Sequence, residues 1–133
     1  MSIVPDSFND LLADETRAFL FLATLMSDGS PQLTPVWFNT DGTHILINSA
    51  GGRVKDRNMR THPQVALVVQ DPKNPYRYIQ IRGQVVEITQ EGAVDHVNYL
   101  AGKYTGTPKY QNFQPGEQRF IYKILPKKVY TRG

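Results

Sequence analysis

Apolar and polar residues alternate along several short stretches of the chain, which is the spacing of half-buried β-strands. Within residues 32–39, Leu33, Pro35 and Trp37 point to one side and the residues between them point to the other. Asp-Gly pairs at 28–29 and 41–42 favour tight turns, so the first three strands are predicted to form an antiparallel meander. The predicted strands cover residues 18–27, 32–39, 44–49, 65–69, 76–89 and 120–125, the last extended by 127–130.

Three segments have helical rather than strand signals. Residues 6–12 can be capped by Asp6 or Ser7, and residues 91–104 repeat apolar side chains at helical spacing. A short basic helix is expected before Pro63. Pro35 inside a strand predicts an edge or a bulge, because proline donates no ladder hydrogen bond. Six or seven antiparallel strands with two or three short helices predict a mainly β fold, a small barrel.

Composition narrows the class of protein. The chain has 133 residues, so 1–133 is expected to be a single domain, and 40% hydrophobic residues suffice for a packed core. It contains no cysteine, which removes disulfides and thiolate metal sites, and the three histidines are too dispersed for a zinc site. The longest apolar run, Ala18 to Met26, is too short to span a bilayer, and no secretory signal precedes it. We therefore expect a cytoplasmic protein without a metal or a membrane partner.

The densest positive charge lies at residues 53–60, directly after two glycines. One anion, Asp56, accompanies four cations, which are Arg53, Lys55, Arg57 and Arg60. Glycines let a backbone approach a ligand, and a helix start favours anions. Arginine and lysine side chains also bind phosphate groups. This segment is therefore a candidate phosphate-binding loop, and the alternative is a solvated basic helix face.

The order of several motifs resembles a known family. They are Pro31-Gln32-Leu33-Thr34-Pro35-Val36-Trp37-Phe38, Asp41-Gly42, Gly52-Arg53-Val54-Lys55-Asp56-Arg57-Asn58-Met59 with His62-Pro63, Tyr76-Arg77-Tyr78-Ile79-Gln80-Ile81-Arg82-Gly83-Gln84-Val85, Lys103-Tyr104-Thr105-Gly106 and Tyr122-Lys123-Ile124-Leu125-Pro126-Lys127-Lys128-Val129-Tyr130. Together they resemble the split β-barrel flavoproteins related to pyridoxamine 5′-phosphate oxidase. The similarity is to the branch assigned to the 8-hydroxy-5-deazaflavin coenzyme F-420.

The resemblance implies a set of cofactor-binding residues. Ser49, Arg53 and Lys55 match the positions for the cofactor phosphate and its anionic tail, and Asn58 follows in the same pattern or bonds the loop. The strand along the ring system is matched by Gln32, Pro35 and Val36, with Trp37 either beside the ring or in the core. Tyr76 and Tyr78 match positions that reach the cofactor from the second subunit, because this family forms its sites across a homodimer interface.

The resemblance also implies an activity, which is hydride transfer between F-420 and a small conjugated acceptor. The tail from Lys127 to Gly133 lacks the Arg-x-His pattern of the true pyridoxamine phosphate oxidases, so oxidation of the vitamin is not expected. No side chain must act as an acid or base, and the catalytic residues stay unassigned.

Three alternatives remain open. FMN could replace F-420 on the same fold, or the protein could bind the cofactor without catalysis. A nucleic-acid module is the third, because Tyr76, Tyr78 and Arg82 share one strand face. Arg77 lies opposite, however, and the net charge is only +3, so no nucleic-acid partner is expected.

Overall fold

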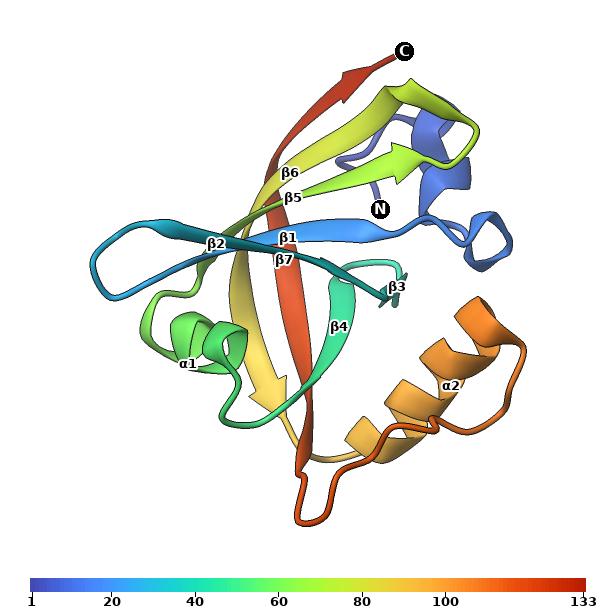
Figure 1. The fold of residues 1–133 in the computed structure, drawn as a ribbon. Coiled ribbons are helices and arrows are strands. Elements are labelled where there is room, and N and C mark those ends of the chain that lie inside the picture. Colours follow the sequence, from blue (N-terminus) through green and yellow to red (C-terminus); the bar gives the residue numbers. More distant parts are fainter.

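The computed structural model describes all 133 residues as seven strands, two α-helices and two short 3-10 helices (Figure 1). The mainly β prediction is therefore confirmed. The elements in chain order are η1 (Asp6–Leu12), η2 (Asp14–Thr16), β1 (Leu20–Leu25), β2 (Pro31–Val36), β3 (Asn39–Thr40), β4 (Ile45–Ala50), α1 (Val54–Thr61), β5 (Gln64–Asp71), β6 (Asn74–Thr89), α2 (Ala93–Thr105) and β7 (Arg119–Arg132).

All strands belong to one curled antiparallel sheet in the order β2-β1-β5-β6-β7-β4-β3. The predicted meander is wrong, because β2 pairs with β1 alone and β3–β4 lies at the opposite edge of the sheet. Trp37 and Phe38 interrupt the segment 31–40, so its two halves pair with different strands. This single segment thus lies at both edges of the sheet and closes the half-barrel.

The core lies inside the curl, where alternating strand residues point inward. Leu20 and Leu22 from β1 meet Ile45 and Ile47 from β4, all at most 1% exposed. Burying each such side chain contributes about 1.5–3 kcal/mol. The first predicted helix forms a 3-10 rather than an α-helix, yet its predicted apolar face is buried. In β1 and β4 every second residue is buried, as expected for strands with one face in the core, whereas in β2 Leu33 stays 66% exposed.

Two predicted irregularities are also confirmed. Pro35 lies on the edge strand β2, where its missing N–H leaves no ladder bond unmade. At Gly83 the register of β6 against β7 shifts, and an added Cβ would lie 2.9 Å from the Leu125 carbonyl oxygen. Glycine is therefore required for the close approach of these two strands.

The two α-helices lie on either side of β4, with α1 beneath the β1–β2 hairpin and α2 outside the sheet (Figure 1). The run from Thr107 to Gln118 returns from α2 to β7 at the same end of the molecule. No helix of the protein is long and apolar enough to cross a membrane.

Candidate functional site

A pocket of about 300 Å³ opens between the end of β2, β4, α2 and the segment before β7. Five of the residues predicted for the cofactor line it together, although they come from two separate segments. They are Pro35, Val36, Trp37, Arg53 and Lys55. The remaining lining residues are Phe19, Asn48, Val97, Leu100, Tyr110, Asn112 and Arg119.

Three cations converge on this pocket. Arg53 and Lys55 stand at the start of α1, and Arg119 begins β7. Lys55 is half-buried and makes no ion pair or side-chain hydrogen bond, which distinguishes it from its neighbours. Desolvation lowers the Lys55 pKa, and the charges of Arg53 and Arg119 lower it further. An anion bound here would relieve that repulsion.

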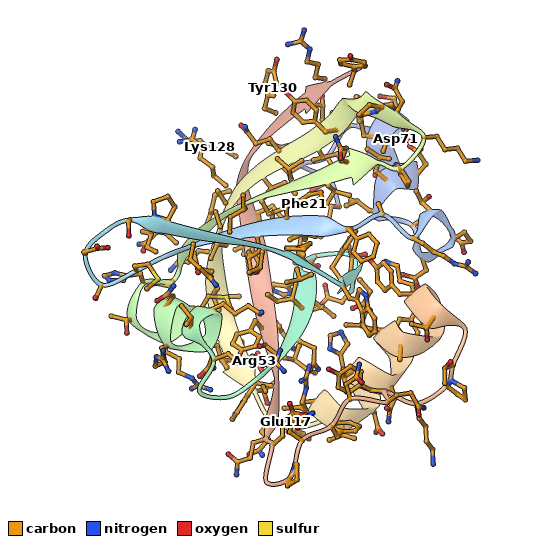
Figure 2. All side chains as sticks on the ribbon, in the orientation of Figure 1. Phe21, Arg53, Asp71, Glu117, Lys128 and Tyr130 are labelled. Carbon is orange, nitrogen blue, oxygen red and sulfur yellow. The ribbon has the colours of Figure 1, made fainter.

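A single carboxylate, Glu117, partly balances this charge. One of its oxygens lies 3.5 Å from Arg53 and 3.4 Å from Arg119. The Glu117 side chain is only 5% exposed, and its second oxygen has no hydrogen-bond partner. Figure 2 shows Arg53 and Glu117 at the end of the sheet opposite Lys128 and Tyr130. The pocket therefore keeps an excess of positive charge, and beside it Glu117 has one buried oxygen without a hydrogen-bond partner.

Aromatic rings form the other wall. Trp37 stacks on Tyr104 with centroids 5.4 Å apart and planes 8° from parallel. Tyr110 meets Trp37 edge-on at 6.1 Å, and Phe113 meets Tyr110 in the same way at 5.0 Å. Such a wall suits the face of a planar ring system. Trp37 thus lines the pocket instead of the barrel core.

The glycine turn works differently from the sequence-based expectation. The Gly52 N–H donates to the Asp56 carboxylate at 2.9 Å, and that carboxylate also accepts from Arg60 and the Tyr122 hydroxyl. Arg57 donates to the Gly52 carbonyl oxygen. Asp56, Arg57 and Arg60 therefore hold the turn in place, and only two of the four predicted cations face the pocket.

The other predicted residues do not line the pocket of this chain. Gln32 and Asn58 both bond to the buried Thr24 hydroxyl at 3.1 Å, beneath α1. Ser49 is fully buried, and its hydroxyl contacts only the Ala50 carbonyl oxygen. These three residues support the barrel end from inside.

Tyr76 and Tyr78 belong to the other end of the sheet. Tyr76 is 80% exposed, and Tyr78 lies 6.4 Å from the ring of Tyr130. Their predicted role, contact with the cofactor of a second subunit, stays a prediction.

Two polar pocket residues, Asn48 and Arg119, and the adjacent Glu117 escaped the sequence analysis, because they stand in segments without a local motif. A charged pair two residues apart at a strand start, Glu117 and Arg119, was the only available signal. Such a pair is common on protein surfaces.

Comparison with known proteins decides the family. The sequence model of pyridoxamine 5′-phosphate oxidase matches residues 5–133, nearly the whole chain. The chain belongs to this family. The resemblance drawn from the sequence motifs is thereby confirmed at family level. No curated protein matches the chain.

Solved structures of the family's fold extend the comparison. An F-420 reductase is 32% identical, with a TM-score of 0.82 over 96% of this chain and 98% of that chain. A conserved hypothetical protein from Mycobacterium tuberculosis is 24% identical, with a TM-score of 0.74 over 98% of this chain and 86% of that chain. The heme storage protein HutZ from Vibrio cholerae is 13% identical, with a TM-score of 0.68 over 96% of this chain and 93% of that chain. The last two show a shared fold alone.

Proposed function

We propose that the protein is an oxidoreductase that transfers hydride between coenzyme F-420 and a small conjugated organic acceptor. The observation that carries this proposal is Lys55, a half-buried cation without a partner, between two arginines and beside an aromatic wall. A site with this charge fits a phosphate, and the adjacent wall fits a planar ring.

The pocket residues divide the binding between them. Arg53, Lys55 and Arg119 would hold the phosphate and the acidic tail, arginine by paired hydrogen bonds and lysine as a point charge. Pro35 and Val36 offer an apolar strand to the ring system, and Trp37 with Tyr110 excludes water from it. When bound, the coenzyme supplies the hydride chemistry. The protein binds, orients and shields the reacting ring.

The choice of F-420 over FMN rests on two supports. The first is the 32% identity to an F-420 reductase over nearly the full length. The second is the excess of positive charge, which favours the ligand with the longer acidic tail. FMN is the second candidate, because the family profile that matches is that of a flavin-type oxidase.

A second copy of the chain is part of the proposal. The outer face of β1, β2, β5 and β6 has a hollow of about 450 Å³ with an apolar part that includes Phe21, Leu33 and Val68, bordered by Gln70, Gln80 and Arg82. Leu33 is 66% exposed there. An apolar face of this kind marks an interface on a soluble protein. We propose that the partner covers it and brings its own Tyr76 and Tyr78 to the pocket.

Coenzyme binding provides the decisive test. Purified protein is titrated into oxidised F-420 and, separately, into FMN, and the change in coenzyme fluorescence is followed. We expect saturable binding of F-420 at micromolar protein, followed by oxidation of reduced F-420 when enones or quinones are added. Absence of binding by either coenzyme contradicts the proposal, and tighter binding of FMN selects the second candidate. Binding without turnover on any acceptor identifies a coenzyme carrier.

Light scattering and one variant test the dimer. The wild-type protein should have twice the mass of a 15.1 kDa chain. Leu33→Asp should give a folded monomer, because dimer formation would bury the new carboxylate at this face without a compensating opposite charge. Val94→Asp, at an exposed apolar position on α2 away from this face, is the matched control and should stay dimeric.

A further inference from the structure

His96 links helix α2 to the cation pocket through a chain of hydrogen bonds. It is 9% exposed and faces the sheet. Its Nε2 lies 2.8 Å from Asn39 Oδ1, and its Nδ1 lies 3.1 Å from Asn48 Nδ2. Asn48 in turn accepts a hydrogen bond at 2.8 Å from Nε of Arg119, one of the three pocket cations. These hydrogen bonds thus connect the buried His96 to Arg119, a residue of the cation pocket.

Two fixed groups determine the direction of every bond in this chain. Arg119 has only donors, so the Asn48 atom that faces it must be the amide oxygen. The Ala93 carbonyl is only an acceptor, and the Asn48 amide nitrogen lies 2.8 Å from it. The second N–H of that amide therefore points to His96 Nδ1. Nδ1 must accept, so the proton of the neutral ring is on Nε2 and is donated to Asn39.

The surroundings of His96 keep it in this neutral form. Burial lowers the pKa of His96 to about 4, and the nearby positive charge of Arg119 adds to the effect. Protonation would turn Nδ1 into a donor facing the Asn48 amide hydrogens. The amide would then have to rotate and present its NH₂ group to the guanidinium.

We propose that His96 is a positioning residue that, together with the Ala93 carbonyl oxygen, holds Asn48 and through it fixes the direction of the Arg119 guanidinium in the anion site. Asn48 holds Nε, and Glu117 shares Nη1, so the rest of the guanidinium is left for a ligand. A buried arginine without this support would have several rotamers to choose from, and fixing it beforehand removes that entropic cost from binding. Only the identity of the ligand in this inference rests on the proposed function.

Nuclear magnetic resonance tests the chain without any ligand. In ¹⁵N-labelled wild-type protein, His96 should show the Nε2–H tautomer, and the Arg119 Nε–H should exchange slowly with water. His96→Phe keeps a ring but removes the acceptor, and should make that Arg119 proton exchange rapidly. His96→Asn retains an oxygen near the Nδ1 position and should preserve slow exchange.

Binding of inorganic pyrophosphate, measured by calorimetry, gives the functional readout. His96→Phe should weaken it about tenfold, the effect of one hydrogen bond to a charged group, and His96→Asn should stay within about threefold of wild type. Leu11→Ala is the control for stability, since Leu11 is a buried core residue in η1. It should lower the melting temperature without changing either readout.

Each contrary result has its own meaning. An Nδ1–H tautomer, slow Arg119 exchange in His96→Phe, or equal losses in His96→Phe and His96→Asn overturns the positioning role. If neither F-420 nor FMN binds while the Arg119 and pyrophosphate results hold, the proposed function fails and the positioning role stands. If wild-type protein does not bind pyrophosphate, the anion-site claim is overturned regardless of the tautomer.

Discussion

Two lysines of this protein lose contact with solvent, Lys103 almost completely and Lys55 by about half, and only Lys103 has bonding partners. Lys103 on α2 donates to the Phe38 carbonyl oxygen at 2.6 Å, lies 3.4 Å from Asp14 and sits 4.2 Å above the Phe38 ring. Lys55 on α1 has no partner and faces two arginines. Desolvation lowers the pKa of both lysines, but Asp14 opposes the shift at Lys103, whereas Arg53 and Arg119 increase it at Lys55.

The difference separates a structural cation from a binding cation. A depressed lysine pKa alone is found at both sites, so it identifies neither. The distinguishing feature is the missing counter-charge at Lys55, since a buried charge is stable only when it is paired. Lys103 stabilises the fold, whereas the repulsion at Lys55 is unfavourable and would be relieved by an anionic ligand of the kind proposed above.

The largest expected effect is on the stability of a Lys103→Met variant. Removing the ammonium leaves the Phe38 carbonyl oxygen with only the long 3.5 Å contact of the Tyr104 hydroxyl, so the free energy of unfolding should fall by about 2–3 kcal/mol. Urea unfolding measures this value. Unchanged stability would mean that Lys103 is no better satisfied than Lys55, and the comparison would fail.

The corresponding variant Lys55→Met should behave in the opposite way. Affinity for the bound coenzyme should fall about 30-fold, equivalent to about 2 kcal/mol for a charge-assisted contact. The free energy of unfolding should be unchanged or higher, because the repulsion with Arg53 and Arg119 is removed. Coenzyme fluorescence and urea unfolding measure the two quantities. A clear loss of stability would show that Lys55 has a structural partner.

Glu117→Gln should have a smaller effect, which is an increase in coenzyme affinity. The carboxylate competes with a ligand for Arg53 and Arg119, so neutralising it should tighten coenzyme binding about fivefold. The control is Glu87→Gln, which removes an exposed acid that pairs with Lys123 outside the pocket. Weaker binding in Glu117→Gln would instead assign its free oxygen to a hydrogen bond with the ligand.

The smallest effect concerns pH. Because the pKa of Lys55 is lowered, the lysine loses its proton below the ordinary value of 10.5, and coenzyme affinity should decline as pH rises toward it. The stability of the protein without coenzyme should change with pH in the opposite direction. Unfolded chains bind more protons at this site, so the Lys55 contribution to stability rises with pH in the same window. Lys55→Arg should remove both trends, since arginine stays charged. Affinity measured from neutral pH to pH 10 decides this point.

Local sequence signals predicted much of the fold, and the family resemblance named five of the 12 residues that line the pocket. The helix pattern of 91–104 gave the buried face of α2, because burial has the period of the secondary structure, whereas the alternation along 32–39 did not, since Leu33 is 66% exposed. The meander was wrong because alternation says which side of a strand faces inward and nothing about its neighbour. Trp37 and Phe38 break the strand in a way that no turn residue announces.

The rest of the site depends on contacts between distant segments. Arg119 reaches Lys55 from 64 positions away, and His96 lies beside Asn48 only because α2 packs on β4. The basic run 53–60 looked uniform in sequence. Asp56 and its bonds to Gly52, Arg60 and Tyr122 divided it into anchoring and pocket-facing residues.

The segment 31–40 closes the half-barrel at both edges of the sheet, and the same segment carries three pocket residues, Pro35, Val36 and Trp37. Substitutions at these three positions therefore alter the ligand wall and the seam of the barrel together. The segment 107–118, which supplies Tyr110 and Asn112 to the pocket, belongs to no strand and so does not form the seam of the barrel. Substitutions in segment 107–118 should therefore disturb the fold least, and directed evolution toward new acceptors should begin there.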